Sequence, residues 1–281
     1  MRIGQNPLRE SKVTPPSQVQ FCVVTHLPNQ DEGYHEHRLD IIKLCLNSLR
    51  KHSSVGEINI FDNGSCPALL YWLQDEYKPN RLILSRNVGK VWAQNALIRM
   101  FPKDTLIHFN DDDVLLSPGF VETELQLLQE FPNVACASGA AIRTMFRWAC
   151  DATIRWAQQE ALLEVGRFIP DEQENDYAIS IGRDPQVHRE MTKDDRDYKI
   201  TYNGIEAYAT SHHMEFMGFQ KQLVKATDWS DSSAMGSMRP WDYAMEKIGL
   251  RLATIKRYAR HVGNVLDEGV YNQAKEERMF E

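Results

Sequence analysis

Apolar and polar residues alternate in short blocks along the first half of the chain. Gln20–Thr25 is an apolar run of strand length, and a helix is predicted over Leu39–Arg50, where apolar residues recur every three or four positions. The alternation continues with strands at Ile58–Phe61, Arg81–Leu84, Thr105–Phe109 and Asn133–Ala137, and with helices at Leu69–Tyr77, Val88–Met100 and one that opens at Ser117-Pro118.

Strands that alternate with helices favour parallel pairing, right-handed crossovers and helices on both faces of the sheet. The pattern therefore predicts an α/β fold with a mostly parallel central sheet. Ligands of such sheets bind beyond the carboxyl ends of the strands. The polar turns that follow the first four strands are expected to converge on one crevice.

The second half is less regular. Arg143–Leu163 is amphipathic and predicted to be helical, and Met214–Phe219 and Leu250–Ile255 resemble strands on either side of a helix over Arg239–Ile248. Residues 171–202 are rich in charge and poor in apolar side chains, which predicts a surface loop or lid.

Composition narrows the class of protein. The chain has 281 residues and a net charge of −7, which argues against nucleic acid as its main partner but leaves nucleic acid open as an acceptor. No apolar run reaches the ~20 residues that span a bilayer, and the polar segment 1–18 has no signal-peptide core. Five widely spaced cysteines predict buried free thiols and, with them, a cytoplasmic protein.

Three consecutive aspartates carry the strongest chemical signal. Asp111, Asp112 and Asp113 follow a buried strand, and in an extended segment the first and third side chains point the same way. Two carboxylates on one side repel each other unless a cation lies between them, and a hard divalent ion is the natural partner. The alternative is a solvated acidic turn ahead of the next helix.

Weaker signals follow the other strands. Gly89 opens a helix and lets the backbone approach a ligand, and the helix start offers N–H groups to phosphate. Asp62-Asn63-Gly64 and Thr25 stand at the ends of earlier strands, where a plain turn would explain them equally well.

Taken in order, these motifs resemble the family 2 glycosyltransferases of the GT-A fold. The resemblance covers roughly Phe21–Phe120 and rests on four features at sensible spacing. They are a strand that ends in Thr25, the cluster Asp62–Ser65, the run Asn87-x-Gly89-x-x-x-Ala93-x-Asn95, and Asn110–Phe120 with its three aspartates.

The resemblance implies a nucleotide diphosphate sugar as donor and Mn²⁺ or Mg²⁺ as cofactor. Residues 19–140 would bind the nucleotide sugar and 141–262 the acceptor, between a flexible arm (1–18) and a tail (263–281). Asp111 and Asp113 would form the D-x-D pair that holds the metal. The other donor contacts would come from Thr25, Asp62, Arg86, Asn87, Gly89 and Asp112.

Two later residues complete the implied site. Asp242 would be the catalytic base that deprotonates a hydroxyl acceptor, although Trp241 replaces the acidic neighbour that such enzymes often have. His261 stands where some relatives supply a histidine to the metal. A base on the face opposite the leaving group would invert the anomeric configuration, with a hexose or a pentose as the transferred sugar.

Two rival functions stay open. A nucleotidyltransferase that makes nucleotide sugars would need a glycine-rich loop with Arg and Lys after its first strand, which this sequence lacks. A nucleotide-sugar-binding protein without activity is the other alternative. Among the remaining residues, His35, His37, His212 and His213 are expected to be surface features, and Trp229 and Trp241 to stack on a sugar ring. The oligomeric state stays open.

Overall fold

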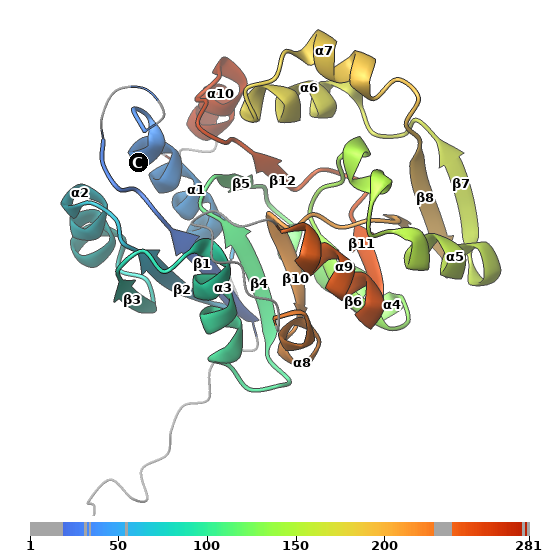
Figure 1. Ribbon diagram of the computed structural model, residues 1–281, viewed down its shortest axis with the longest axis horizontal. Helices are drawn as coiled ribbons and strands as arrows, with labels where there is room; N and C mark the ends of the chain where they lie inside the picture. Colours follow the sequence, from blue (N-terminus) through green and yellow to red (C-terminus); the bar gives the residue numbers. More distant parts are fainter. Residues whose placement is uncertain are drawn as a thin grey trace, which may run out of the picture.

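The computed structural model describes residues 19–30, 33, 35–53, 56–227, 238–276 and 279. The arm 1–18, together with Asp228, Trp229 and Asp231, lies outside this range. The described chain forms an α/β fold around a ten-stranded sheet (Figure 1). From one edge to the other the strands are β3 (Arg81–Ser85), β2 (Gly56–Asn63), β1 (Val19–Thr25), β4 (Leu106–Asp111), β10 (Glu215–Phe219), β6 (Val134–Ser138), β11 (Leu250–Ala253), β9 (Ile205–Tyr208), β8 (Asp197–Tyr202) and β7 (Leu162–Gly166).

The first four strands are parallel, as the sequence predicts. Thr25 at the end of β1 lies opposite Asp62 of β2, and Val24 lies opposite Asp111 of β4. The polar turns therefore meet at the carboxyl ends of these strands. Beyond β4 the sheet is mixed, because β10 runs antiparallel to both β4 and β6. Parallel order therefore holds in the part that positions the aspartates.

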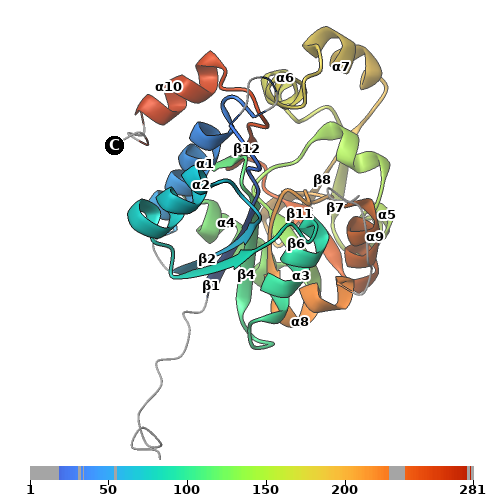
Figure 2. The same cartoon turned by 60° about the vertical axis from the view of Figure 1, so that its left-hand side comes forward.

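Helices cover both faces of the sheet (Figure 2). The α/β prediction is confirmed in this respect, because an apolar cluster separates the sheet from the helices on each side. On one face lie α1 (Arg38–His52), α2 (Pro67–Tyr71), a π-helical turn (Trp72–Tyr77) and α4 (Phe120–Glu130). On the other lie α3 (Lys90–Arg99), α8 (Gln220–Leu223), a 3₁₀ turn (Val224–Ala226) and α9 (Arg239–Ile248).

The second half corrects several predictions. The expected helix over Arg143–Leu163 is instead a 3₁₀ turn (Arg143–Arg147), α5 (Asp151–Glu160) and the start of β7. The expected loop over residues 171–202 holds α6 (Asp171–Ser180), α7 (Pro185–Met191) and β8. Buried ion pairs take the place of an apolar stripe there, which is why apolar periodicity did not reveal these elements.

Two smaller predictions also fail, and the tail, for which no element was predicted, holds a helix. The helix placed after Ser117-Pro118 begins at Phe120, behind Gly119 at φ 92°, so serine is not its cap. The C-terminal tail contains α10 (Glu268–Glu276). Trp241 is fully buried, with its ring 4.3 Å from that of Phe216, and therefore belongs to the core rather than to a sugar-stacking surface.

Two buried carboxyl groups, Glu124 of α4 and Glu215 of β10, lie beside His108 of β4. His108 Nε2 is 2.8 Å from Glu215 Oε1 and 3.6 Å from Glu124 Oε2, and all three side chains are buried. Burial, and then the neighbouring Glu215, raise the pKa of Glu124 well above its ordinary value. Burial beside Glu215 therefore favours the neutral form of the Glu124 carboxyl in the folded protein.

Glu124→Gln is expected to flatten the loss of stability with rising pH. A carboxyl whose pKa is raised by folding stabilises the fold at low pH, and this stabilisation is lost as the pH rises from the unfolded value towards the folded one. The slope is at most about 1.4 kcal/mol per pH unit. Urea unfolding of wild type and variant between pH 5 and 9 measures it. The exposed Glu122→Gln on the same helix is the control; equal slopes in all three proteins would contradict the prediction.

Candidate active site

The three aspartates lie at the carboxyl end of β4, and each one faces a basic side chain. Asp111 Oδ2 is 2.6 Å from Lys90 Nζ at the start of α3. Arg38, the first residue of α1, pairs with Asp112 through one nitrogen and with Asp113 through the other, the latter at 3.0 Å. Three carboxylates and two basic side chains leave one negative charge uncompensated when all five groups are ionised.

The pKa shifts of the three carboxyl groups differ in direction. Burial raises the pKa of Asp112 to about 6, against the opposing effect of Arg38, and it also raises the pKa of Asp111, against that of Lys90. Burial pushes the pKa of Asp113 upward as well, but Arg38, His261 and Lys90 outweigh it and the pKa is lowered. Asp113 is therefore the most firmly ionised member of the group.

These aspartates form one wall of a cavity of about 390 Å³. This volume falls within the range of ligand sites in proteins, roughly 300–1,000 Å³. The cavity lies at the edge of the parallel strands, which is where the sequence places it. Its lining consists of Val24, His26, His35, Arg38, Asn63, Asn87, Lys90, Asp111, Asp112 and Asp113.

The turn after β2 is built beneath this cavity. The buried Asp62 accepts hydrogen bonds from Thr25 Oγ1 at 3.1 Å and from the backbone N–H groups of Gly64 and Ser65. Gly64 has φ 85°, and a Cβ there would lie 2.6 Å from the backbone nitrogen of Asn87, so only glycine fits. Thr25 and Asp62 are thus adjacent, as predicted, but they are not among the cavity-lining residues.

The turn between β3 and α3 lies against the first turn. Asn63 Oδ1 accepts from the N–H of Val88 at 2.8 Å, and Asn63 Nδ2 donates to Asn87 Oδ1 at 3.2 Å. Gly89, at φ 88°, reverses the chain into α3. Arg86 is exposed and does not line the cavity. The start of α3 therefore points its positive end towards the cavity that Lys90 helps to line.

His261 reaches the aspartates through a second, two-stranded sheet. Strand β12 (Ala259–His261) pairs antiparallel with β5 (Val114–Leu116), with His261 opposite Val114. This register brings His261 Nε2 to 3.7 Å from Asp113 Oδ2. Burial lowers the pKa of the His261 imidazole, although Asp113 opposes the shift. The ring also lines a cavity of about 30 Å³ beside Tyr177 and His212.

Asp242 lies in the first turn of α9 but faces the protein interior. One carboxylate oxygen pairs with the buried Arg251 of β11, and the other is 2.8 Å from His213 Nδ1. Asp242 is fully buried, whereas the His213 side chain is 23% exposed. His213 precedes β10, whose pairing with β4 brings the carbonyl of Met214 to the N–H of Asp111. The His213–Asp242 pair therefore flanks the aspartates.

The expectation that His212 is a surface residue is wrong. His212 is buried, and burial lowers its pKa well below the ordinary value, so it is not a surface residue. Among the described residues, the side chains whose ligand atoms approach within 4.8 Å in a group of three are His108, Glu124 and Glu215. All three side chains are buried and none lines the 390 Å³ cavity, and the raised pKa of Glu124 favours its neutral form.

Sequence reasoning missed the basic partners of the aspartates. Lys90 directly follows the Asn87–Gly89 motif, so its place at the cavity could have been inferred. Arg38 stands 73 positions before Asp111 and carries no local signal. His26 and Asn63 adjoin predicted residues and line the cavity with them.

Comparison with known proteins finds a family match for part of the chain. Residues 34–166, a little under half of the chain, match the family model Glycosyl transferase family 2. No curated protein matches the chain. A crystal structure of GalNAc-T7 with UDP, GalNAc and Mn²⁺ is similar to this structure, with 11% sequence identity and a TM-score of 0.48, over 88% of this chain and 44% of that one. The chain thus spans less than half the length of that protein.

Residues 34–166 are thus similar to the family 2 glycosyltransferases. The matched range contains the parallel strands β2, β3 and β4 and the three aspartates, whereas β1, Asp242 and His261 lie outside it. No helix in the described part of the chain combines the length and the apolar character needed to cross a membrane.

Proposed function

We propose that this chain transfers a sugar from a nucleotide diphosphate sugar to a hydroxyl acceptor, with Mn²⁺ or Mg²⁺ held by Asp111, Asp113 and His261. The observation that carries this proposal is the carboxylate wall of the 390 Å³ cavity at the carboxyl ends of the parallel strands. A family 2-like glycosyltransferase would need a donor site of this kind, and the cavity lies where α/β sheets bind their ligands.

The residues present fit a divalent cation. Asp113 and His261 offer an oxygen and a nitrogen 3.7 Å apart, and the three aspartates exceed their basic partners by one charge. The bound ion would stabilise the negative charge that develops on the departing diphosphate. Lys90 would turn from Asp111 towards the phosphates, because it lines the same cavity.

The donor nucleotide would extend from the aspartates towards the two Asn-containing turns. Asn63 and Asn87 line that side of the cavity, and Gly89 holds the start of α3 beside them. Thr25 and Asp62 would act from beneath by fixing the turn, and the exposed Arg86 would contact the nucleotide at the mouth. Asp112 would share Arg38 with Asp113 and so hold this arginine in place.

Deprotonation of the acceptor is assigned to Asp242 together with His213. Nδ1–H of His213 donates to Asp242, which leaves the lone pair of the ring on Nε2. The acceptor proton would pass to that atom, and Asp242 would stabilise the imidazolium that forms. Attack from the face opposite the diphosphate inverts the anomeric configuration.

A panel of UDP-, GDP- and TDP-sugars tests the proposal by thermal shift, with and without Mn²⁺. We expect one nucleotide class to raise the melting temperature only when the metal is present. Release of the free nucleoside diphosphate from the selected donor would establish transfer or hydrolysis. Release of pyrophosphate from a sugar phosphate and a nucleoside triphosphate would point to a nucleotidyltransferase, and binding without turnover to a non-catalytic protein.

The segment 171–202 is expected to respond to the donor or acceptor. Val187 and Met191 of α7 are more than two-fifths exposed although apolar, so this helix has surface available for a ligand-bound arrangement. Hydrogen exchange should show added protection in α7 and its flanking turns when nucleotide and Mn²⁺ are present. The same protection with and without ligands would count against a lid.

A further inference from the structure

Helix α6 contacts His261, one of the proposed metal ligands, directly. Ser180, its last residue, places Oγ 2.7 Å from Nδ1 of His261 and 2.7 Å from the carbonyl oxygen of Tyr177, one turn earlier. The Tyr177 ring lies 6.1 Å from the His261 ring. Two side chains of α6 therefore border the imidazole on the side away from Asp113.

The hydrogen bonds of Ser180 define the tautomer of His261. A carbonyl oxygen can only accept, so the hydroxyl hydrogen of Ser180 is donated to Tyr177. Oγ is then left as an acceptor, and the partner 2.7 Å away must donate to it. His261 therefore carries its hydrogen on Nδ1 and presents a lone pair on Nε2.

That lone pair faces a carboxylate. Nε2 of His261 and Oδ2 of Asp113 are 3.7 Å apart, which is beyond hydrogen-bond length, and in this tautomer neither atom can donate to the other. Asp113 Oδ2 accepts from Arg38 here, and a metal cation between this oxygen and Nε2 would bind both acceptors. The orientation imposed by Ser180 is thus the one that a metal ligand requires.

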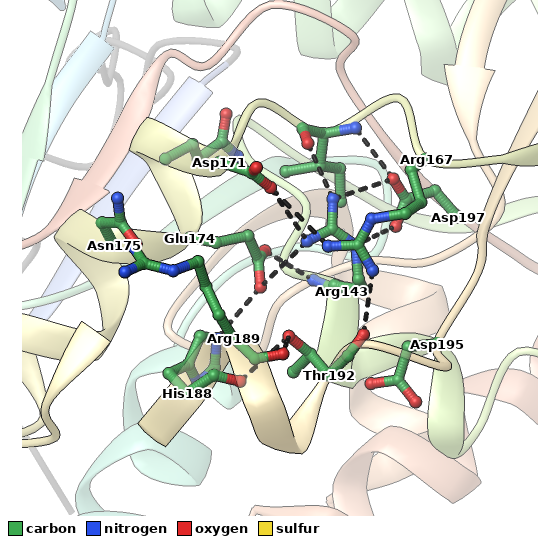
Figure 3. Close-up of polar contacts among 12 residues, drawn as sticks. Arg143, Arg167, Asp171, Glu174, Asn175, His188, Arg189, Thr192, Asp195 and Asp197 are labelled. Atoms are coloured by element: carbon green, nitrogen blue, oxygen red, sulfur yellow. Dashed lines mark hydrogen bonds and ion pairs between the residues drawn. The ribbon is translucent and has the colours of Figure 1, made fainter. Parts of the chain in front are cut away.

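A buried network holds α6 in place (Figure 3). Glu174 of α6 accepts from the N–H of Arg143 at 2.8 Å and from His188 Nε2 of α7 at 3.0 Å. The Arg143 guanidinium binds Asp197 of β8 at 3.0 Å. All four side chains are buried, so the network fixes α6 against both α7 and the sheet. Ser180 therefore stands on a helix that buried polar contacts join to α7 and to the turn at Arg143.

We propose that Ser180 is a positioning residue that fixes the ring of His261 for metal binding, and that α6 is the structural arm which carries it. This inference rests on the proposed metal site. In this inference α6 is not part of a lid that closes over the donor. The helix would support His261 both with and without the donor.

The experiment uses Mn²⁺ alone as the probe, with free ion measured by its electron paramagnetic resonance signal. Ser180→Ala is expected to weaken Mn²⁺ binding by about 10–100-fold, the usual effect of losing a hydrogen bond behind a ligating histidine. Ser180→Thr keeps the hydroxyl and should bind within a few-fold of wild type. Asn175→Ala removes a hydrogen bond with Arg189 elsewhere on α6 and is the matched control.

A double-mutant cycle shows whether Ser180 acts through His261. In a chain that carries His261→Ala, the further change Ser180→Ala should leave the remaining Mn²⁺ affinity unchanged. Melting temperatures check that each variant is folded. If wild type binds Mn²⁺ and Ser180→Ala binds it with the same affinity, the inference is overturned but the proposed metal site is not. An equal loss in both backgrounds would also overturn it, and a wild type that binds no Mn²⁺ would overturn both.

Discussion

Asp113→Ala is expected to abolish the Mn²⁺-dependent part of nucleotide binding while the protein stays folded. Asp113 is the aspartate with the lowered pKa and the one that faces His261, so it would supply the most reliable anionic ligand. Arg38 keeps Asp112 as a partner in the variant, which limits the cost to stability. Calorimetric titration of the nucleotide selected by the donor panel, with and without Mn²⁺, measures the effect.

Asp104→Ala is the matched control for this prediction. Asp104 is 90% exposed and precedes β4, at the end of that strand away from the cavity. The control should bind nucleotide like wild type in both conditions. If Asp113→Ala keeps the full metal-dependent gain in affinity, Asp113 is not a metal ligand and the D-x-D assignment fails.

Loss of the Asp242 carboxylate is expected to produce the second large effect. Asp242→Asn should reduce turnover by about 10²–10⁴-fold with donor affinity nearly unchanged, because the imidazolium that forms on His213 would lose the carboxylate that stabilises it. The variant should also lose about 3–5 kcal/mol of stability, since it leaves the charge of Arg251 buried without its partner. Nucleoside diphosphate release and urea unfolding measure the two effects separately.

His213→Gln separates catalysis from folding. Glutamine can still donate to Asp242 but cannot accept a proton, and the partly exposed position makes a small stability change, within about 1 kcal/mol, the expected result. Turnover should fall as far as in Asp242→Asn. His52→Gln, at the far end of α1 from Arg38, is the control. Near-normal turnover in both variants would show the base to be elsewhere, with Asp228 and Asp231 as the next candidates.

The assignment of Asp242 shows how far a motif can be taken. Its place near the start of a helix after Pro240 was readable from the sequence, and α9 has that start. Its burial was not readable, because Arg251 and His213 come from separate strands and meet it only in the folded chain. A carboxylate that a helical pattern places on the surface can thus be buried by partners from distant parts of the sequence.

The sequence by itself determined the elements of the first half and the strand ends at which the candidate site lies. Short-range periodicity predicts β1, β2, β3 and β4, and parallel order then brings Thr25, Asp62 and Asp111 to one edge. These inferences need only neighbouring residues and the geometry of crossovers. They did not extend to residues 171–202, where buried charge pairs replace the apolar stripe that periodicity detects.

Only the tertiary structure decided which groups surround the aspartates. Arg38 reaches them from the start of α1, His261 through the pairing of β12 with β5, and Ser180 from the end of α6. Each contact joins positions far apart in the chain, so its formation depends on the packing of whole elements. The side chain of an arginine, a serine or a histidine carries no local pattern that specifies its partner, and that is the physical reason the sequence left these contacts open.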